Sequence, residues 1–142
     1  MTKKRRLIYQ INVARHAMMK YLDAGSRETL GVSATQLTAL MALRENGGLL
    51  MSELAEVLML DKSAVTGLAK RMIANELIVR VPSENDARAS LLKVTAKGNE
   101  KIELGLKLLK GVNKQISEGF TEDELVIVSR FLEHLRSTFS ND

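Results

Sequence analysis

The 142-residue chain has no cysteine, no tryptophan and a single proline. The absence of cysteine excludes disulfide bonds and thiol-based redox sensing, and it is compatible with the reducing cytoplasm in which we expect the protein to act. Because only three Phe and two Tyr are present, the core must consist mainly of Leu, Ile, Val, Met and Ala. One proline together with long apolar periodicities is typical of a helical protein.

Membrane-spanning and catalytic motifs are also missing. No apolar run approaches the roughly 18 residues of a membrane span, and the basic start of the chain lacks the apolar core of a secretory signal. The chain has no phosphate-binding glycine loop, no Gly-x-Ser-x-Gly elbow and no paired His and carboxylate at motif spacing, so we do not expect an enzyme. His16 and His134 are isolated, and the sequence therefore predicts neither a metal site nor a cofactor.

The net charge of +4 is unevenly distributed. Residues 1–60 hold eight Lys or Arg against five Asp or Glu, residues 61–98 hold seven against four, and residues 99–142 hold six against eight. A basic excess in the middle of the chain is what contact with nucleic-acid phosphate requires, although an ordinary solvated surface would have the same charge. The run Lys3–Arg6 indicates a basic N-terminal arm.

The most informative stretch runs from Ser52 to Thr95. It predicts two short helices joined by a tight turn, then two strands around a polar loop. Ser52 is expected to cap the first helix, which ends near Met59, and Asp61 is expected to cap the second. The second helix buries Val65, Leu68, Met72 and Ile73.

The opposite face of the second helix is small near its start and basic toward its end. It comprises Lys62, Ser63, Thr66, Gly67, Lys70 and Arg71. Small polar side chains let the backbone approach the major groove of DNA, and the cations meet phosphate. A solvated helix face is the alternative, but the small-then-basic order favours DNA.

The two strands are expected at Ile78–Val81 and Leu91–Thr95, with turn-forming residues between them. Arg80 is expected to point away from the apolar face of the first strand. Helix, turn, helix and basic-tipped hairpin together predict a winged helix-turn-helix. Arg88 would reach the minor groove, where narrow A·T-rich DNA attracts arginine, and Asp86 would orient Arg88 or brace the wing by an ion pair. An exposed loop pair of little consequence is the alternative.

Apolar stripes flank this unit on both sides. Helices are expected at residues 7–23, from Ser33 onward, from Thr95 to about Gly119, and after Thr121. Ser33 and Gln36 would form a capping box, and Thr35 and Gln36 would either donate to DNA phosphate or serve only as caps. Gly25 is expected near a bend or the end of the helix that begins at residue 7. Leu49 to Met51 could pair with the wing as a third strand.

The C-terminal stripes need a partner. In the long helix the expected stripe is Ile102, Leu106, Leu109, Val112, Ile116 and Phe120. The last helix repeats Leu125, Val128, Leu132, Leu135 and Phe139 at steps of three and four, which is an a/d seam. Gly105 and Gly111 inside the long helix either allow close packing or are merely tolerated. So much apolar surface on a small domain predicts a homodimer.

The chain resembles the multiple-antibiotic-resistance regulator (MarR) family of bacterial transcription factors. The matching segments are SELAEVL, LDKSAVTGLAKRM, LIVR and DARASLLKVTAKG. The Asp-x-Arg of the wing, followed by an apolar strand and Thr-x-x-Gly, is the most specific element. The resemblance covers essentially the whole chain. Met59 and Glu76 depart from the family pattern at positions where glycine is common, and Asn75 is expected to take the left-handed cap instead of Glu76.

The resemblance implies a mostly α fold in which residues 33–95 form the winged helix-turn-helix with a small antiparallel wing. Residues 1–32 and 96–142 would form the helical dimerisation region of one compact domain. The implied function is sequence-specific binding of double-stranded DNA, at a pseudo-palindromic operator, by a homodimeric repressor. The implied DNA-binding residues are Thr35, Gln36, Lys62, Ser63, Thr66, Gly67, Lys70, Arg71, Asp86 and Arg88. A winged-helix protein-interaction module or adaptor that does not bind DNA is the alternative.

The resemblance also implies release from DNA by a small molecule, often aromatic or phenolic. We expect a cavity lined by the inner ends of the helix at residues 7–23, the helix from Ser33 onward and the long helix after the wing. Arg15 or His16 could receive an anion there, or could equally face solvent.

Overall fold

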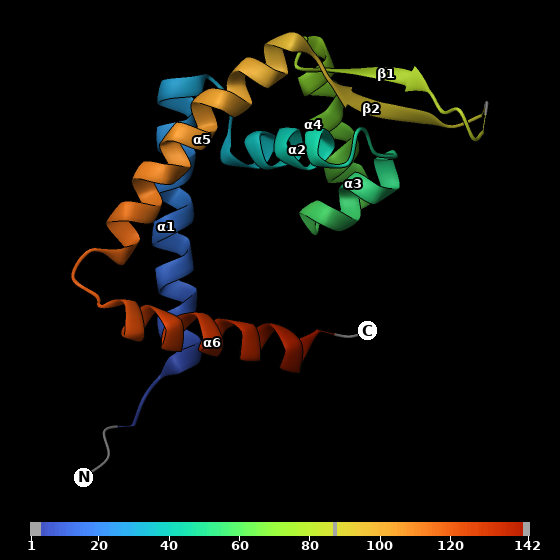
Figure 1. The fold of residues 1–142 in the computed structure, drawn as a ribbon. Helices are drawn as coiled ribbons and strands as arrows, with labels where there is room; N and C mark the ends of the chain where they lie inside the picture. Colours follow the sequence, from blue (N-terminus) through green and yellow to red (C-terminus); the bar gives the residue numbers. More distant parts are fainter. Residues whose placement is uncertain (1–3, 87, 141–142) are drawn as a thin grey trace. The chain divides into compact units, whose positions relative to one another are not determined.

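Figure 1 shows a computed structural model of the chain, which describes residues 4–86 and 88–140. In chain order the elements are α1 (Leu7–Leu30), α2 (Ala34–Glu45), α3 (Met51–Leu58), α4 (Lys62–Ala74), β1 (Ile78–Pro82), β2 (Ser90–Val94), α5 (Ala96–Ser117) and α6 (Glu122–Phe139). The predicted mostly helical winged helix-turn-helix is confirmed. One compact unit runs to Leu108 and a second begins at Leu109, so that their boundary lies within α5. Lys3, the first residue of the predicted basic arm, lies outside the described residues.

The core of the first unit is aliphatic, as the composition predicts. In α2 the buried residues are Leu37, Ala39, Leu40, Ala42 and Leu43. Leu54 of α3, Met72 of α4, Leu92 of β2 and Ile102 of α5 join this core and are almost completely buried. Each such side chain contributes about 1.5–3 kcal/mol by leaving water. The helix-turn-helix and the wing are therefore fixed on one shared core.

Most helix starts lie where the sequence predicts. Ser33 accepts a hydrogen bond from the Gln36 backbone N–H, and Asp61 and Thr121 cap α4 and α6 in the same way. The predicted Ser52 cap is wrong, because α3 begins one residue earlier, at Met51. There the Leu50 N–H donates to the Glu53 Oε1 at 2.9 Å, which satisfies the start of the helix without a hydroxyl.

The first helix is longer than predicted. It continues from residue 23 through Gly25 to Leu30 and ends at Gly31, whose φ of 74° is left-handed. One interior glycine costs about 1 kcal/mol relative to alanine, which is too little to end a helix. A Cβ at Gly25 would lie 3.4 Å from the Leu108 Cδ1, which is an ordinary van der Waals distance, so the packing of α1 does not require glycine there.

The wing is a two-stranded antiparallel hairpin that projects beyond α3 and α4 in Figure 1. The segment before α3 adds one antiparallel bridge, Leu49 to Leu92, in place of the third strand that was considered. The register pairs Ile78 with Val94 and Arg80 with Leu92. Arg80 therefore lies on the face that carries buried Ile78 and Leu92, and the prediction that it points away from that face is wrong. The Arg80 side chain is nevertheless exposed, although Leu92 opposite it is buried.

Both helices of the helix-turn-helix end in the same backbone motif. The N–H groups of Leu60 and Met59 bond to the carbonyls of Ala55 and Glu56, which closes α3 in a Schellman motif. Its left-handed position is Met59, with φ 54°.

At the end of α4 the N–H groups of Leu77 and Glu76 bond to the carbonyls of Met72 and Ile73 in the same pattern. Glu76 has φ 61°, whereas Asn75 has φ −87°, so the prediction that Asn75 takes the left-handed cap is wrong. The hydrogen-bond pattern requires the left-handed residue immediately after the cap, and this requirement overrides the preference of asparagine for that conformation.

The Thr-x-x-Gly motif joins the start of α5 to the end of α4. Thr95 caps α5 by accepting from the Gly98 N–H at 3.0 Å, and its hydroxyl lies 2.7 Å from the Glu76 carbonyl oxygen. A Cβ at Gly98 would lie only 2.3 Å from the Leu77 carbonyl oxygen. Gly98 is therefore required by the close approach of two backbone segments.

The other two glycines of α5 differ from each other. A Cβ at Gly105 would lie 2.5 Å from the Leu37 Cδ1, so this glycine allows α5 to pack closely on α2. A Cβ at Gly111 would have nothing within 4 Å, so this glycine is merely tolerated in the chain as described.

Much of the predicted apolar stripe of the C-terminal helices faces solvent. In α5 the buried positions include Ile102 and Val112, whereas Leu106, predicted to be in the same stripe, is exposed and Leu108 packs on the core. None of the residues of α6, all of which the structure describes, is buried. In the described residues, no helix is both long and apolar enough to cross a membrane.

Candidate nucleic-acid interface

The helix α4 presents the predicted reading face to solvent. Val65, Leu68, Ala69 and Met72 are buried and anchor the helix on the core. On the other side Lys62, Ser63, Thr66, Lys70 and Arg71 are exposed, and Gly67 is half-buried. The hydrophobic anchor thus fixes the orientation in which the small and basic side chains face outward.

Asp61 organises the start of this reading face. Its Oδ1 accepts from the Ala64 N–H at 2.8 Å and from the Ser63 hydroxyl at 3.0 Å. These hydrogen bonds, the Ala64 N–H first, lower the pKa of the Asp61 carboxyl, which is therefore ionised at neutral pH. One turn further along, the Thr66 hydroxyl donates to the Lys62 carbonyl oxygen at 2.7 Å.

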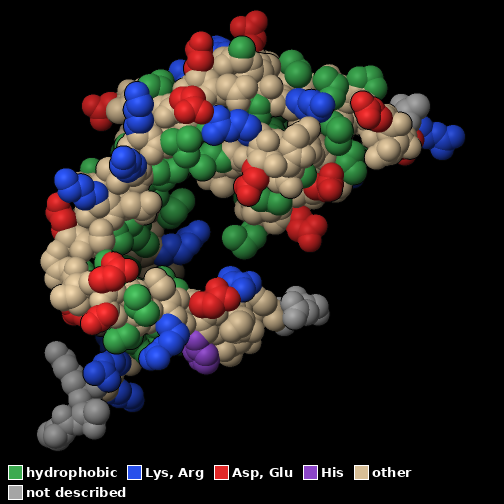
Figure 2. Space-filling model, viewed as in Figure 1, with side chains coloured by type: hydrophobic (Ala, Val, Ile, Leu, Met, Phe, Trp, Pro, Cys, Tyr) green, Lys and Arg blue, Asp and Glu red, His purple; other side chains and the backbone are tan. Residues whose placement is uncertain are grey.

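The wing tip is braced by backbone hydrogen bonds. Asp86 Oδ1 accepts from the backbone N–H of Arg88 at 2.9 Å, and the Asp86 carbonyl accepts from the Ala89 N–H. The ion pairs found among the described residues do not include Asp86 and Arg88, so Asp86 braces the wing through its carboxylate bond to the Arg88 N–H and through its own carbonyl instead. The Arg88 side chain is exposed, and Figure 2 shows basic side-chain atoms at the outer end of the β1–β2 hairpin.

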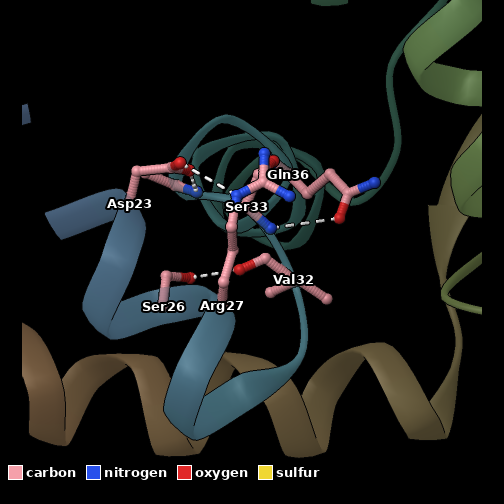
Figure 3. A network of polar contacts seen from close by, with 7 residues as sticks. Asp23, Ser26, Arg27, Val32, Ser33 and Gln36 are labelled. Carbon is pink, nitrogen blue, oxygen red and sulfur yellow. Dashed lines mark hydrogen bonds and ion pairs between the residues drawn. The ribbon is translucent and has the colours of Figure 1, made fainter. Parts of the chain in front are cut away.

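A polar joint holds the start of α2 against α1 (Figure 3). Asp23 accepts from the Arg27 Nε and from the Ala34 N–H, each at 2.9 Å, and these bonds, that of Arg27 first, lower the pKa of the Asp23 carboxyl. Buried Ser26 donates to the Val32 carbonyl oxygen at 2.7 Å. The sequence analysis missed this joint. Its only sequence signal was the spacing of Asp23 and Arg27, one helical turn apart.

Thr35 and Gln36 lie at the same start of α2, where they were predicted either to contact DNA phosphate or to cap the helix. The Gln36 Oε1 accepts from the Ser33 N–H at 3.2 Å, so its carbonyl end is used in the capping box. Thr35 is exposed at the same helix start. The capping role considered for Gln36 is therefore confirmed, and a phosphate contact from either residue stays a prediction.

A cleft of 620 Å³ lies between α1, the start of α2 and α4. Its basic lining residues are His16, Lys20, Arg27 and Arg71. The Arg71 guanidinium lies back along α4, with Nη1 3.4 Å from where a Cβ of Gly67 would be. The predicted cavity had α5 as its third wall, whereas this cleft has α4, the reading helix. Arg15 is not among its lining residues.

Within residues 4–86 and 88–140, no three or more His, Asp or Glu side chains gather in a way that could bind a metal ion.

The helix α4 is anchored by its hydrophobic face and turns small and basic side chains outward. Next to it stands a braced hairpin with an arginine at its tip. Together these features define a winged helix-turn-helix protein of the DNA-binding type. Comparison with known proteins gives the family. A model of the MarR family matches residues 30–89. The chain is 32% identical over 117 residues to the helix-turn-helix transcriptional repressor MdtR of Bacillus subtilis, and the match covers 82% of this chain and 76% of that protein. The protein belongs to the MarR family of transcription regulators.

Solved structures show the same fold. A MarR variant from E. coli, crystallised with operator DNA, has a TM-score of 0.76 with this chain at 23% identity, covering 94% of this chain and 99% of that one. NadR in complex with 4-hydroxyphenylacetate has a TM-score of 0.73 at 24% identity, covering 95% of each chain.

Proposed function

We propose that this protein is a homodimeric transcription repressor that binds a pseudo-palindromic double-stranded operator and is released by a small anionic ligand. The observation that carries the DNA-binding part is the exposed face of α4, where small side chains precede cations on a helix anchored by its opposite face. MdtR, whose match covers 82% of this chain, is named a repressor. A protein that binds genomic DNA in this way would act in the cytoplasm.

The roles of the side chains follow from their positions. Ser63, Thr66 and Gly67 would lie against the base edges of the major groove, and Lys62, Lys70 and Arg71 would contact base edges or phosphate. Arg88 would enter the minor groove, with Asp86 bracing the hairpin that carries it. Thr35 and Gln36 would support phosphate contact at the start of α2.

A dimer gives the exposed apolar faces a partner. The a/d seam of α6 contains Leu132 and Phe139, which are 54% and 77% exposed in a single chain. Two copies that bury these faces against each other would present two reading helices to successive major grooves, about 10 base pairs apart.

The cleft between α1, α2 and α4 supports the ligand-binding part. Lys20 and Arg71 suit a carboxylate, since Arg27 in the same lining is already paired with Asp23, and Met19, Leu60 and Leu68 offer apolar surface for a ring. Because Arg71 belongs both to this cleft and to the reading helix, a bound anion would compete with DNA for its charge. A ligand that favours another position of the reading helix lowers DNA affinity by its differential affinity for the two states.

The DNA-binding part is tested by fluorescence anisotropy with duplexes selected from a random pool. We expect affinity to fall steeply with salt, and Lys70→Ala to lower the salt slope by about one unit. Lys110→Ala, on α5 and outside the reading face, is the matched control and should leave the slope unchanged. A wild-type protein that is not retained on heparin and selects no duplex would favour the protein-interaction alternative.

The ligand-binding part is tested by adding 4-hydroxyphenylacetate and related phenolic acids to the complex with DNA. A ligand of the proposed class should weaken DNA binding by about 5- to 150-fold, and Lys20→Ala should reduce that response without changing DNA affinity in its absence. If no phenolic acid changes DNA binding, the sensing proposal fails and the DNA-binding proposal stands.

A further inference from the structure

Two hydroxyl groups stand on the outward face of α4, one turn apart, at Ser63 and Thr66. Both side chains are exposed, and both belong to the small half of the reading face. A free hydroxyl can donate a hydrogen bond to one base and accept one from another, so it does not discriminate between bases that present donors and bases that present acceptors. The structure removes that ambiguity, because each hydroxyl is already bonded within the protein.

The direction of each of these hydrogen bonds is fixed by its partner. The Thr66 Oγ1 lies 2.7 Å from the Lys62 carbonyl oxygen, which has no proton to give, so Thr66 is the donor. The Ser63 Oγ lies 3.0 Å from the Asp61 Oδ1, which also accepts from the Ala64 N–H. That carboxylate is ionised, so Ser63 is likewise the donor. Each hydroxyl therefore faces outward with its lone pairs only.

We propose that Ser63 and Thr66 act on DNA only as hydrogen-bond acceptors and that they select amino bases, adenine or cytosine, on the strand they face. Adenine N6 and cytosine N4 are the donors of the major groove, whereas the guanine O6 and the thymine O4 are acceptors. A keto base at the same place would bring two acceptors together without a proton between them. The inference rests on the proposed DNA-binding function and adds the chemical class of base that this part of the helix reads.

The charge of Asp61 supports the same selection. Its carboxylate lies at the start of α4 and is exposed, beside Ser63. Carboxylates accept from cytosine N4 and repel the guanine edge. At the start of the reading helix Asp61, Ser63 and Thr66 thus offer acceptors, with Lys62 as the one cation among them, whereas the donors Lys70 and Arg71 come one to two turns later.

The test is a selection from a random duplex pool by four proteins: the wild type, Thr66→Val, Thr66→Ser and Thr29→Val. Valine keeps the shape of threonine without the hydroxyl, and serine keeps the hydroxyl. Thr29 is the matched control, because its hydroxyl donates to the Gly25 carbonyl oxygen in the same back-bonded geometry, on α1. Circular dichroism melting confirms that each variant is folded.

For the wild type we expect one position per half-site to prefer adenine or cytosine over guanine or thymine on one strand by about 5- to 50-fold. Thr66→Val should lose that preference at that position, whereas Thr66→Ser and Thr29→Val should keep it. A second measurement replaces the selected adenine by purine, or the selected cytosine by 2-pyrimidinone, since both analogues lack the amino group. The analogue should weaken binding of the wild type and have little further effect on Thr66→Val.

Three results would overturn the inference. The first is a keto base at the position whose preference depends on Thr66, and the second is a wild-type preference that Thr66→Val does not alter at any position. The third is an equal loss from the base analogue in the wild type and in Thr66→Val. Selection of no sequence at all by the wild type is a different failure, because it removes the proposed function itself.

Discussion

At the scale of single residues, Gly98 has the least space of the glycines in the helices of the described chain. A side-chain carbon there would lie 2.3 Å from the Leu77 carbonyl oxygen and 2.7 Å from the Val94 Cγ1. We predict that Gly98→Ala lowers the free energy of unfolding by about 1–3 kcal/mol, because the backbone at the end of the reading helix must shift. Urea denaturation measures this, and an unchanged midpoint would show that α5 can move away without loss.

Gly67 provides the contrasting case, since a Cβ there meets nothing closer than the Arg71 Nη1 at 3.4 Å. We predict that Gly67→Ala raises the free energy of unfolding by about 0.5–1 kcal/mol, because alanine is the better helix former. The added methyl also stands on the reading face, so DNA affinity should fall in the same variant. Urea denaturation measures the free energy of unfolding of this variant, and fluorescence anisotropy measures its affinity for DNA. A rise in both the stability and the DNA affinity would show that Gly67 does not face DNA.

Met59 and Glu76 hold left-handed backbone conformations without being glycine. A left-handed backbone conformation costs a residue with a Cβ about 1–2 kcal/mol, and a glycine at the same position avoids this cost. Part of that gain is offset, because glycine has more conformational freedom to lose from the unfolded chain. We predict that Met59→Gly and Glu76→Gly each stabilise the protein by about 0.5–1 kcal/mol. Met59→Ala is the control, because it removes the side chain but keeps the unfavourable φ, and it should give no such gain.

At the scale of elements, the joint between α1 and α2 depends on an ionised Asp23. Its pKa is lowered in the folded state by the Arg27 side chain and by the Ala34 N–H. The stabilisation is therefore present above the pKa of an unfolded aspartate, about 3.9, and it is lost as the pH falls through the lower native pKa. We predict that Asp23→Asn unfolds more easily than the wild type at pH 7 and pH 5, and that the difference closes in more acidic solution. Glu28→Gln on the same helix is the control, and a difference that persists at low pH would contradict the prediction.

The sequence predicted where helices begin better than it predicted where they end or which face of the wing a side chain lies on. Ser33, Asp61 and Thr121 cap through bonds to residues three positions away, and such local bonds can be read from the sequence. The continuation of α1 past Gly25 places Leu30 in the shared core, and the face of Arg80 depends on its register with Leu92. Those contacts join residues distant in sequence, so the local pattern did not contain them.

At the scale of the whole molecule, α6 offers a direct test of the dimer. Leu132 lies on the a/d seam and Val126 lies off it, yet the two side chains are almost equally exposed in one chain, at 54% and 58%. If the protein were a monomer, an aspartate would be tolerated equally at both positions. We predict that Leu132→Asp dissociates or unfolds the protein, because a charge would be buried in an apolar seam, while Val126→Asp leaves the dimer intact. Sedimentation velocity at micromolar concentration distinguishes these outcomes, and a monomeric wild type would count against the proposal.

The candidate site was only partly accessible from the sequence. The reading face of α4 follows from a single helical period, and its exposure agrees with the prediction at Ser63, Thr66 and Lys70. The cleft could not be derived in this way, because its lining residues His16 and Arg71 lie on different helices and are more than fifty residues apart in the sequence. The same reason explains why α5 was expected as its third wall.

Met59 has a practical consequence for following this molecule in solution. It is 91% exposed in the turn between α3 and α4, and the chain contains no cysteine. Met59→Cys would therefore introduce a single thiol per subunit, at which a nitroxide spin label could be attached beside each reading helix. Pulsed dipolar spectroscopy of the labelled dimer would then give the distribution of distances between the two helices. Two resolved peaks whose areas change on titration with a phenolic acid would indicate switching between discrete states, whereas one peak that moves steadily would indicate gradual deformation.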